Sequence, residues 1–184
     1  MPLQILIDPP KEAIPPGFKT VGIPYRPYPL QHAVHEAPQR IRVVCWGRRG
    51  GKSLLALKEG FNMSQRLLQA GIGSPRGVVV APTNQMLREN WWSANRLFTD
   101  LIVQSIVSET RLDLGPFGQM DFKSTESQGG AGRGAGYHWA VLDEASRIPA
   151  QAWEADLRPS LADTRGRALI ISTPCGLNWF YDLY

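Results

Sequence analysis

The 184-residue chain lacks the features that mark secreted, zinc-binding and membrane-spanning proteins. It contains two cysteines, Cys45 and Cys175, and no Cys or His spacing typical of a zinc site. No apolar run is long enough to cross a bilayer, and the N-terminus lacks the basic start and apolar core of a signal peptide. We therefore expect a reduced, cytosolic protein without a membrane partner, in which both cysteines lie buried beside core strands.

An excess of charge of either sign is also missing. Twenty Lys and Arg residues against sixteen Asp and Glu residues give a net charge of +4, which is compatible with a nucleic-acid partner but not diagnostic of one. Arginine outnumbers lysine fifteen to five, and phosphate contacts or a GC-rich genome explain that ratio equally well. The length supports one domain with a sizeable core.

Proline divides the chain into two parts. Residues 1–40 hold nine of the fifteen prolines, so we expect a mostly extended or irregular arm that wraps the domain or another subunit. Helical character begins only at Ala33 to Ala37. Residues 41–184 form the single domain.

The most informative stretch is an apolar run, a glycine-rich turn and a helical pattern between residues 43 and 68. Val43 to Trp46 is short and β-branched enough for a central parallel strand. In the turn, the glycines allow positive φ angles and close backbone approach, so consecutive backbone amides can point at phosphate oxygens. Lys52 can reach the β- and γ-phosphates of a nucleotide, and the Ser53 hydroxyl can ligate Mg²⁺. The turn comprises Gly47, Arg48, Arg49, Gly50 and Gly51.

This loop deviates from the usual G-x-x-x-x-G-K-[ST] spacing, because Trp46 stands where the first glycine belongs. A plain strand-to-helix connection is the alternative interpretation. A second pattern favours the nucleotide: four apolar residues lead into Asp143 and Glu144. Asp143 would hold Mg²⁺ through water, and Glu144 would act as general base on the attacking water. The alternative is that both carboxylates cap the following helix.

A third apolar run, Ala168 to Ile171, ends in Ser172 and Thr173. These hydroxyls could sense the γ-phosphate, although an ordinary strand followed by a turn explains the pattern equally well. Further strands are predicted at 77–82 and as a hairpin within 105–123, and helices at 84–101 and after Pro149.

Together these motifs resemble the ATPase domain of the phage large terminase subunit. The resemblance covers about Tyr28 to Tyr184, and it rests on the loop 47–53, Ala81-Pro82-Thr83, Val141 to Ala145 and the run Ser172 to Tyr181. It implies an α/β fold of the RecA-like P-loop NTPase class (ASCE type), with a mainly parallel sheet and helices on both faces. The expected parallel strands are 41–46, 77–82, 138–143 and 167–172.

The resemblance also implies an activity and its cofactors. We expect an ATP hydrolase that uses ATP and Mg²⁺ to translocate double-stranded DNA into a viral capsid. Gln31 would read the adenine base. Arg133, in the glycine-rich stretch 127–136, would be an arginine finger acting on a neighbouring subunit. The alternative is that Arg48 or Arg49 serves this purpose within its own subunit.

Partners follow from the same family. They are double-stranded DNA, further copies of the chain in a ring, the portal protein and the small terminase subunit, although the isolated domain could be monomeric. The protein would act in the host cytoplasm, docked transiently on the procapsid, and not as a stable virion component. We expect no nuclease activity, because no acidic set remains for a two-metal site. A superfamily 2 helicase fragment and a non-hydrolysing nucleotide-binding adaptor are the rival hypotheses.

Overall fold

The computed structural model describes residues 3–6, 19–126 and 136–183. Its centre is a seven-stranded sheet with the order β3-β9-β8-β4-β7-β6-β5. The strands are β3 Ile41–Cys45, β4 Arg76–Ala81, β5 Gln104–Ile106, β6 Arg111–Asp113, β7 Gln119–Ser124, β8 Trp139–Leu142 and β9 Arg167–Ser172. Pairing is parallel from β3 through β7 in this order, and antiparallel between β7, β6 and β5. The α/β class and all four expected parallel strands are confirmed, each within two residues of its expected limits.

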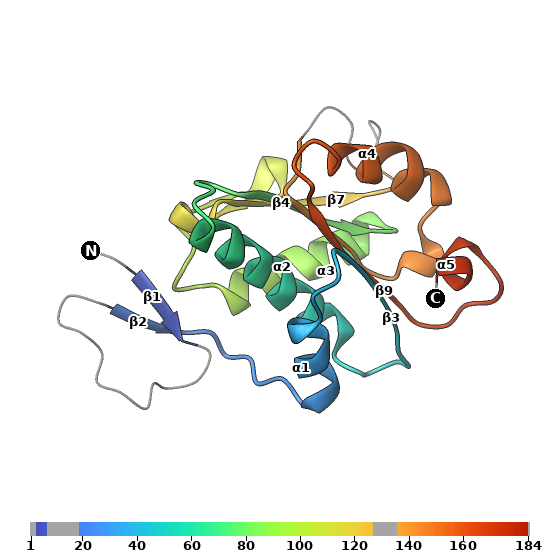
Figure 1. The fold of residues 1–184 in the computed structure, drawn as a ribbon, viewed down its shortest axis with the longest axis horizontal. Helices are drawn as coiled ribbons and strands as arrows, with labels where there is room; N and C mark the ends of the chain where they lie inside the picture. The colour runs from blue at the N-terminus through green and yellow to red at the C-terminus, as the bar shows by residue number, and fades with distance from the viewer. Residues whose placement is uncertain (1–2, 7–18, 127–135, 184) are drawn as a thin grey trace.

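The strands are apolar on both faces because helices cover both faces (Figure 1). Val79, Val141 and Leu169 pack on the side of the long helices α2 Lys52–Gln69 and α3 Asn84–Leu97. Their immediate neighbours in sequence, such as Val80 and Ile170, pack on the opposite side. Alternating residues of one strand therefore serve two separate hydrophobic layers, as buried parallel strands require.

The second face is covered by shorter segments. Residues 150–160 form one continuous helical stretch that contains a π-helical portion, Ala152–Leu157, and the short α4, Arg158–Ser160. This stretch ends one residue after Pro159, and proline interrupts helices because it lacks a backbone N–H and its ring is bulky. The helix α5 Trp179–Leu183 adds Phe180 to the same layer. Single 3₁₀ turns occupy Val107–Glu109, Gly115–Phe117 and Ala145–Arg147.

The expected hairpin is present but is part of a larger arrangement. β6 and β7 are joined by the turn at Gly115–Phe117, and β5 adds a third antiparallel strand. β7 also pairs with β4 in parallel, so the hairpin extends the central sheet rather than flanking it. The strand alternation indicated the hairpin, but its attachment to β4 depends on contacts distant in sequence.

The N-terminal part is more regular than its proline content indicated. β1 Leu3–Leu6 and β2 Lys19–Gly22 form a separate parallel pair, which lies to one side of the main sheet (Figure 1). Helix α1 Pro29–Glu36 begins four residues earlier than expected, because Pro29 occupies the first turn, where a missing N–H costs nothing. None of the described helices is long and apolar enough to traverse a membrane. The expectation of two buried cysteines is not met, because Cys45 is only partly buried and Cys175 is exposed in the turn after β9.

Candidate active site

The glycine-rich loop lies at the edge of the sheet where the parallel strands β3, β9 and β8 all end. Trp46, directly after β3, donates from its backbone N–H to the carbonyl of Ser172, with an N–O distance of 3.1 Å. This bond extends the β3–β9 ladder by one residue and carries the loop toward the end of β9. Carboxyl ends of parallel strands are the usual ligand-binding edge of an open α/β sheet.

The loop follows the expected path with a different distribution of backbone angles. Gly51 has φ of +65°, and a side chain there would place its Cβ 2.8 Å from the Gln31 amide nitrogen. Glycine is therefore required at this position. Gly47 and Gly50 do not use the positive φ that glycine allows, whereas Arg49 does adopt one, with φ of +61°. An arginine in this region costs conformational energy, and such strain is typical of ligand-binding loops.

Lys52 connects the glycine-rich loop to the acidic pair Asp143 and Glu144, which lies about 90 residues further along the sequence. It is the first residue of α2, and its Nζ donates to the carbonyl of Gly47 at 3.0 Å. The same nitrogen lies 3.9 Å from Oε1 of Glu144. Because the side chain is buried, its charge acts on the Glu144 carboxylate with little screening by water. The loop and the acidic pair thus form one site.

Asp143 is the most deeply buried acidic group of the site, with 2% of its surface exposed. Its Oδ2 accepts a hydrogen bond of 3.1 Å from the side-chain amide of Asn90. Its Oδ1 has no hydrogen-bond partner in the described part of the chain. Burial raises the pKa of Asp143, while the nearby Ser53 hydroxyl and the Asn90 amide partly counter that rise. An unpaired buried carboxylate oxygen beside a serine hydroxyl offers the hard oxygen donors that Mg²⁺ prefers.

Glu144 adopts a left-handed backbone conformation, with φ of +52°, which turns the chain sharply after β8. Its Oε2 accepts hydrogen bonds from the Thr173 hydroxyl at 2.8 Å and from the Thr173 backbone N–H at 3.3 Å. The Ser172 hydroxyl lies 3.4 Å from the same oxygen and also contacts Ser146. Ser172 and Thr173 therefore reach the site as expected, and their partner in this structure is the carboxylate of Glu144.

The adenine-reading candidate Gln31 lies beside the loop, on α1. Its Oε1 accepts from the Tyr28 backbone N–H at 3.2 Å, and its Nε2 donates to the Gly51 carbonyl at 3.3 Å. The Tyr28 hydroxyl donates to the Gly50 carbonyl at 2.7 Å, and its ring lies 6.0 Å from that of Trp46. The start of α1 is thus bound directly to the loop. The sequence indicated Gln31 but not the hydrogen bond of Tyr28.

The three arginine candidates differ in position from the other predicted site residues. Arg48 and Arg49 are exposed at the tip of the loop, where they are free to meet a ligand or a neighbour. Arg133 lies outside the described residues. The structure thus brings together Gly47, Gly50, Gly51, Lys52, Ser53, Gln31, Asp143, Glu144, Ser172 and Thr173.

A cluster of buried charges that the sequence did not indicate supports this arrangement. Glu59 on α2 is fully buried and binds Arg42 at 2.7 Å, Arg66 at 2.9 Å and His35 at 2.6 Å. Burial raises the pKa of Glu59, but His35, Arg42 and Arg66 outweigh burial and hold the pKa below its usual range. The cluster ties α1, β3 and α2 together behind the loop.

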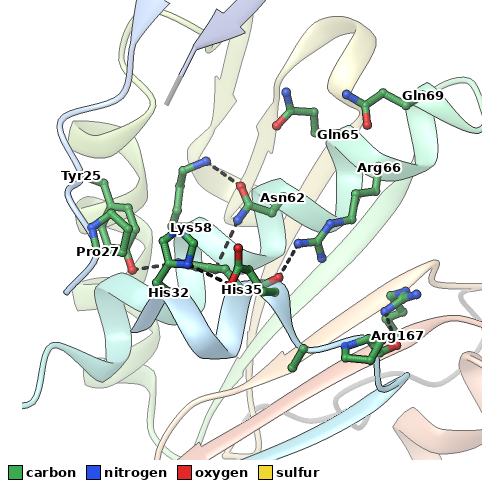
Figure 2. A pocket seen from close by; sticks show the side chains of 13 residues that line it. Tyr25, Pro27, His32, His35, Lys58, Asn62, Gln65, Arg66, Gln69 and Arg167 are labelled. Carbon is green, nitrogen blue, oxygen red and sulfur yellow. Dashed lines mark hydrogen bonds and ion pairs between the residues drawn. The ribbon is translucent and has the colours of Figure 1, made fainter. Parts of the chain in front are cut away.

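A cavity of about 440 Å³ lies over this cluster (Figure 2). Tyr25, His35, Lys58, Arg66 and Arg167 are among its lining residues, and none of the predicted site residues lines it. The cavity is therefore distinct from the candidate active site.

Asn90 contacts Asp143 but was not among the residues that the sequence indicated for the site. A signal was present, because a polar residue occupies the apolar stripe of α3 between Leu87 and Ala94. Polar residues in such positions need a buried partner. The partner, Asp143, is 53 residues away in sequence, so the stripe could indicate the anomaly but not its explanation.

Residues 46–184 match the family described as "Terminase large subunit, T4likevirus-type, N-terminal". The chain belongs to this family. Among curated relatives, the terminase large subunit of Thermus phage G20c is 31% identical over an alignment that covers 91% of this chain and 37% of the relative. That of Escherichia phage T5 is 28% identical, with 83% and 34% covered. This chain therefore spans little more than a third of the length of these curated terminases.

The fold agrees with the family. The large terminase ATPase domain of Thermus phage P74-26 superimposes with a TM-score of 0.73 at 29% identity, covering 88% of this chain and 70% of that domain. The resemblance to phage large terminases and the RecA-like α/β fold expected from the sequence are both confirmed.

Proposed function

We propose that this terminase domain binds Mg-ATP in the loop 46–53 and hydrolyses it to drive double-stranded DNA into a viral capsid. The observation that carries the proposal is the approach of Lys52 Nζ to the Glu144 carboxylate, 3.9 Å away. This contact supports the proposal because it brings the lysine proposed to bind phosphate close to the carboxylate proposed as general base. The family and the structural similarity to a large terminase ATPase domain support the same conclusion.

Binding follows from the chain's own groups. Lys52 and the loop amides would bind the β- and γ-phosphates, and the positive end of α2 favours the same negative charge. Lys52 now donates to the Gly47 carbonyl, and it would exchange that partner for phosphate oxygens. Ser53 and Asp143 would hold Mg²⁺, which neutralises phosphate charge when bound. Gln31 would turn its amide from Tyr28 and Gly51 toward the adenine edge.

Hydrolysis assigns separate tasks to the two oxygens of Glu144. Oε2 stays on Thr173, which fixes the side chain, and Oε1 faces the site. Oε1 accepts a proton from water as the water oxygen attacks the γ-phosphorus. The bond to the β–γ bridging oxygen breaks, and ADP is the leaving group. The Ser172 hydroxyl, at the end of β9 beside Thr173, contacts the same Glu144 oxygen and helps to hold it.

The activity is tested with Glu144→Gln and Lys52→Ala. Glu144→Gln should bind a fluorescent ATP analogue with unchanged affinity and lose at least 100-fold in steady-state turnover. Lys52→Ala should lose binding itself. Duplex DNA should stimulate the wild-type ATPase without strand separation. Strand separation would favour a helicase fragment, and tight binding without turnover by the wild-type chain would favour a nucleotide-binding adaptor; either result contradicts the proposal.

Arg133 is proposed as the arginine finger that completes a neighbouring site, on the basis of the family resemblance. The rival is Arg48 or Arg49, which the exposed loop presents within the same subunit. With portal protein present, so that rings form, mixing Arg133→Ala chains with Lys52→Ala chains should restore ATPase activity, because one retains the nucleotide site and the other the finger. No recovery in the mixture with portal would count against that role for Arg133.

The assembly follows from the function. We expect subunits to form a ring on the portal of a procapsid, with the small terminase subunit as a further partner and a monomeric state for the isolated domain. Such a protein works in the host cytoplasm and leaves the finished particle. Light scattering of the chain with and without portal protein tests this, since a ring should form only with the portal.

A further inference from the structure

Asn90 occupies an unusual place in the molecule. It lies on the core-facing side of α3, is only 6% exposed, and has Leu87, Trp91 and Ala94 as neighbours on that face. Burying an amide in an apolar layer is unfavourable unless the amide forms hydrogen bonds. Its Nδ2 donates to Asp143 Oδ2 at 3.1 Å, which makes this contact the reason the position tolerates a polar side chain.

The contact divides the carboxylate of Asp143 into two unlike oxygens. Oδ2 is held by Asn90, whereas Oδ1 has no hydrogen-bond partner in the described part of the chain. A carboxylate can rotate about its χ2 angle, since that torsion is broad and roughly two-fold. A donor fixed on Oδ2 restricts this rotation and leaves Oδ1 as the oxygen that is open to a further partner.

We propose that Asn90 is a positioning residue of the magnesium site, which holds Asp143 Oδ2 and thereby presents Oδ1 to the metal of Mg-ATP. This inference rests on the proposed function, because it presupposes that Asp143 serves the nucleotide's metal. Asn90 touches neither the nucleotide nor the metal. It acts through Asp143, as partners of metal ligands commonly do, and changing such partners typically costs 10- to 100-fold in metal affinity or activity.

The test compares Asn90→Leu, which keeps the size but removes the donor, with Asn95→Leu. Asn95 lies on the same helix and makes its own hydrogen bonds, to the Trp91 carbonyl and with Ser105, away from Asp143. For each variant, the Mg²⁺ concentration at half-maximal ATPase rate is measured. The affinity for a fluorescent ATP analogue is measured with Mg²⁺ and with EDTA, and urea unfolding is followed in EDTA without nucleotide.

Asn90→Leu should need 10- to 100-fold more Mg²⁺ and lose the gain in nucleotide affinity that Mg²⁺ gives the wild type. Its affinity in EDTA should stay within threefold of wild type. Asn95→Leu should keep the wild-type Mg²⁺ dependence. A lowered unfolding midpoint with unchanged Mg²⁺ dependence would show that Asn90 is structural only and overturn the inference. That outcome leaves wild-type ATPase intact, so it is distinguishable from failure of the proposed function, in which the wild type itself does not hydrolyse ATP.

Discussion

The Thr173 hydroxyl donates a hydrogen bond of 2.8 Å to Oε2 of Glu144, across the gap between the ends of β9 and β8. The ends of two neighbouring parallel strands thus contribute the two residues of this pair, whose carboxylate is the proposed general base. This contact explains the left-handed φ of Glu144, because the turn after β8 directs its side chain toward β9. The first prediction follows from this pair.

Thr173→Val should lower the turnover number for ATP by about 10- to 100-fold and change nucleotide affinity less than threefold. The hydroxyl donates to the Glu144 carboxylate and holds it in place, so its loss should affect the chemical step selectively. Thr173→Ser keeps the donor and should retain most of the activity. An equal loss of affinity would indicate instead that Thr173 binds the nucleotide directly.

Glu59→Gln should reduce the free energy of unfolding by about 3–5 kcal/mol, because it leaves the buried Arg42 without its charged partner. Urea unfolding at pH 7 measures this. The matched control is Glu36→Gln, which breaks the exposed pair with His32 and should cost less than about 1 kcal/mol.

The dependence of stability on pH in the acidic range provides an independent check on the contribution of Glu59. Its pKa is lower in the folded state than in the unfolded state, so its stabilising contribution is complete above about pH 4.3 and disappears as the pH falls through the folded pKa. The stability gap between wild type and Glu59→Gln should therefore narrow in strong acid. A gap of constant size down to pH 2 would mean that packing, not charge, makes Glu59 important.

The sequence predicted the fold and the chemistry of the site to different depths. Local patterns were sufficient to predict the four parallel strands, because β-branched apolar runs favour strands. The residues that directly follow these runs indicated the edge of the sheet at which the candidate site lies. The contact of Lys52 with Glu144 was predictable because parallel strands end at one edge. The Glu59 cluster was not predictable, because Arg42, His35 and Arg66 look like ordinary surface charges in the sequence. They meet Glu59 only when α1 has folded against α2.

Lys58 gives a prediction for alkaline pH. Burial lowers the pKa of Lys58 to about 8, whereas an unfolded lysine titrates near pH 10.4. Between these values the unfolded chain binds more protons, so Lys58 makes stability rise with pH by up to about 1.4 kcal/mol per pH unit. Lys58→Met should be more stable than wild type at pH 7, with a difference that shrinks from pH 8 to pH 10. A difference independent of pH would contradict this assignment.

Gly77 in β4 gives the last prediction, because the fully buried ring of Trp139 lies over it. The two residues are paired across β4 and β8, and the Trp139 indole N–H donates to the Ser64 hydroxyl at 2.8 Å. A Cβ at position 77 would lie 1.8 Å from the ring. Gly77→Ala should therefore destabilise the domain by at least about 3 kcal/mol, at the upper end of the usual cost of overpacking.

The control is Gly73→Ala, where a Cβ meets nothing within 4 Å, and its unfolding free energy should stay within about 0.5 kcal/mol of wild type. The double variant Gly77→Ala with Trp139→Leu should be more stable than the sum of the two single losses indicates, since the smaller side chain makes room for the new methyl group. Strict additivity in urea unfolding would show that the alanine is accommodated elsewhere, and that the indole does not determine the need for glycine at position 77.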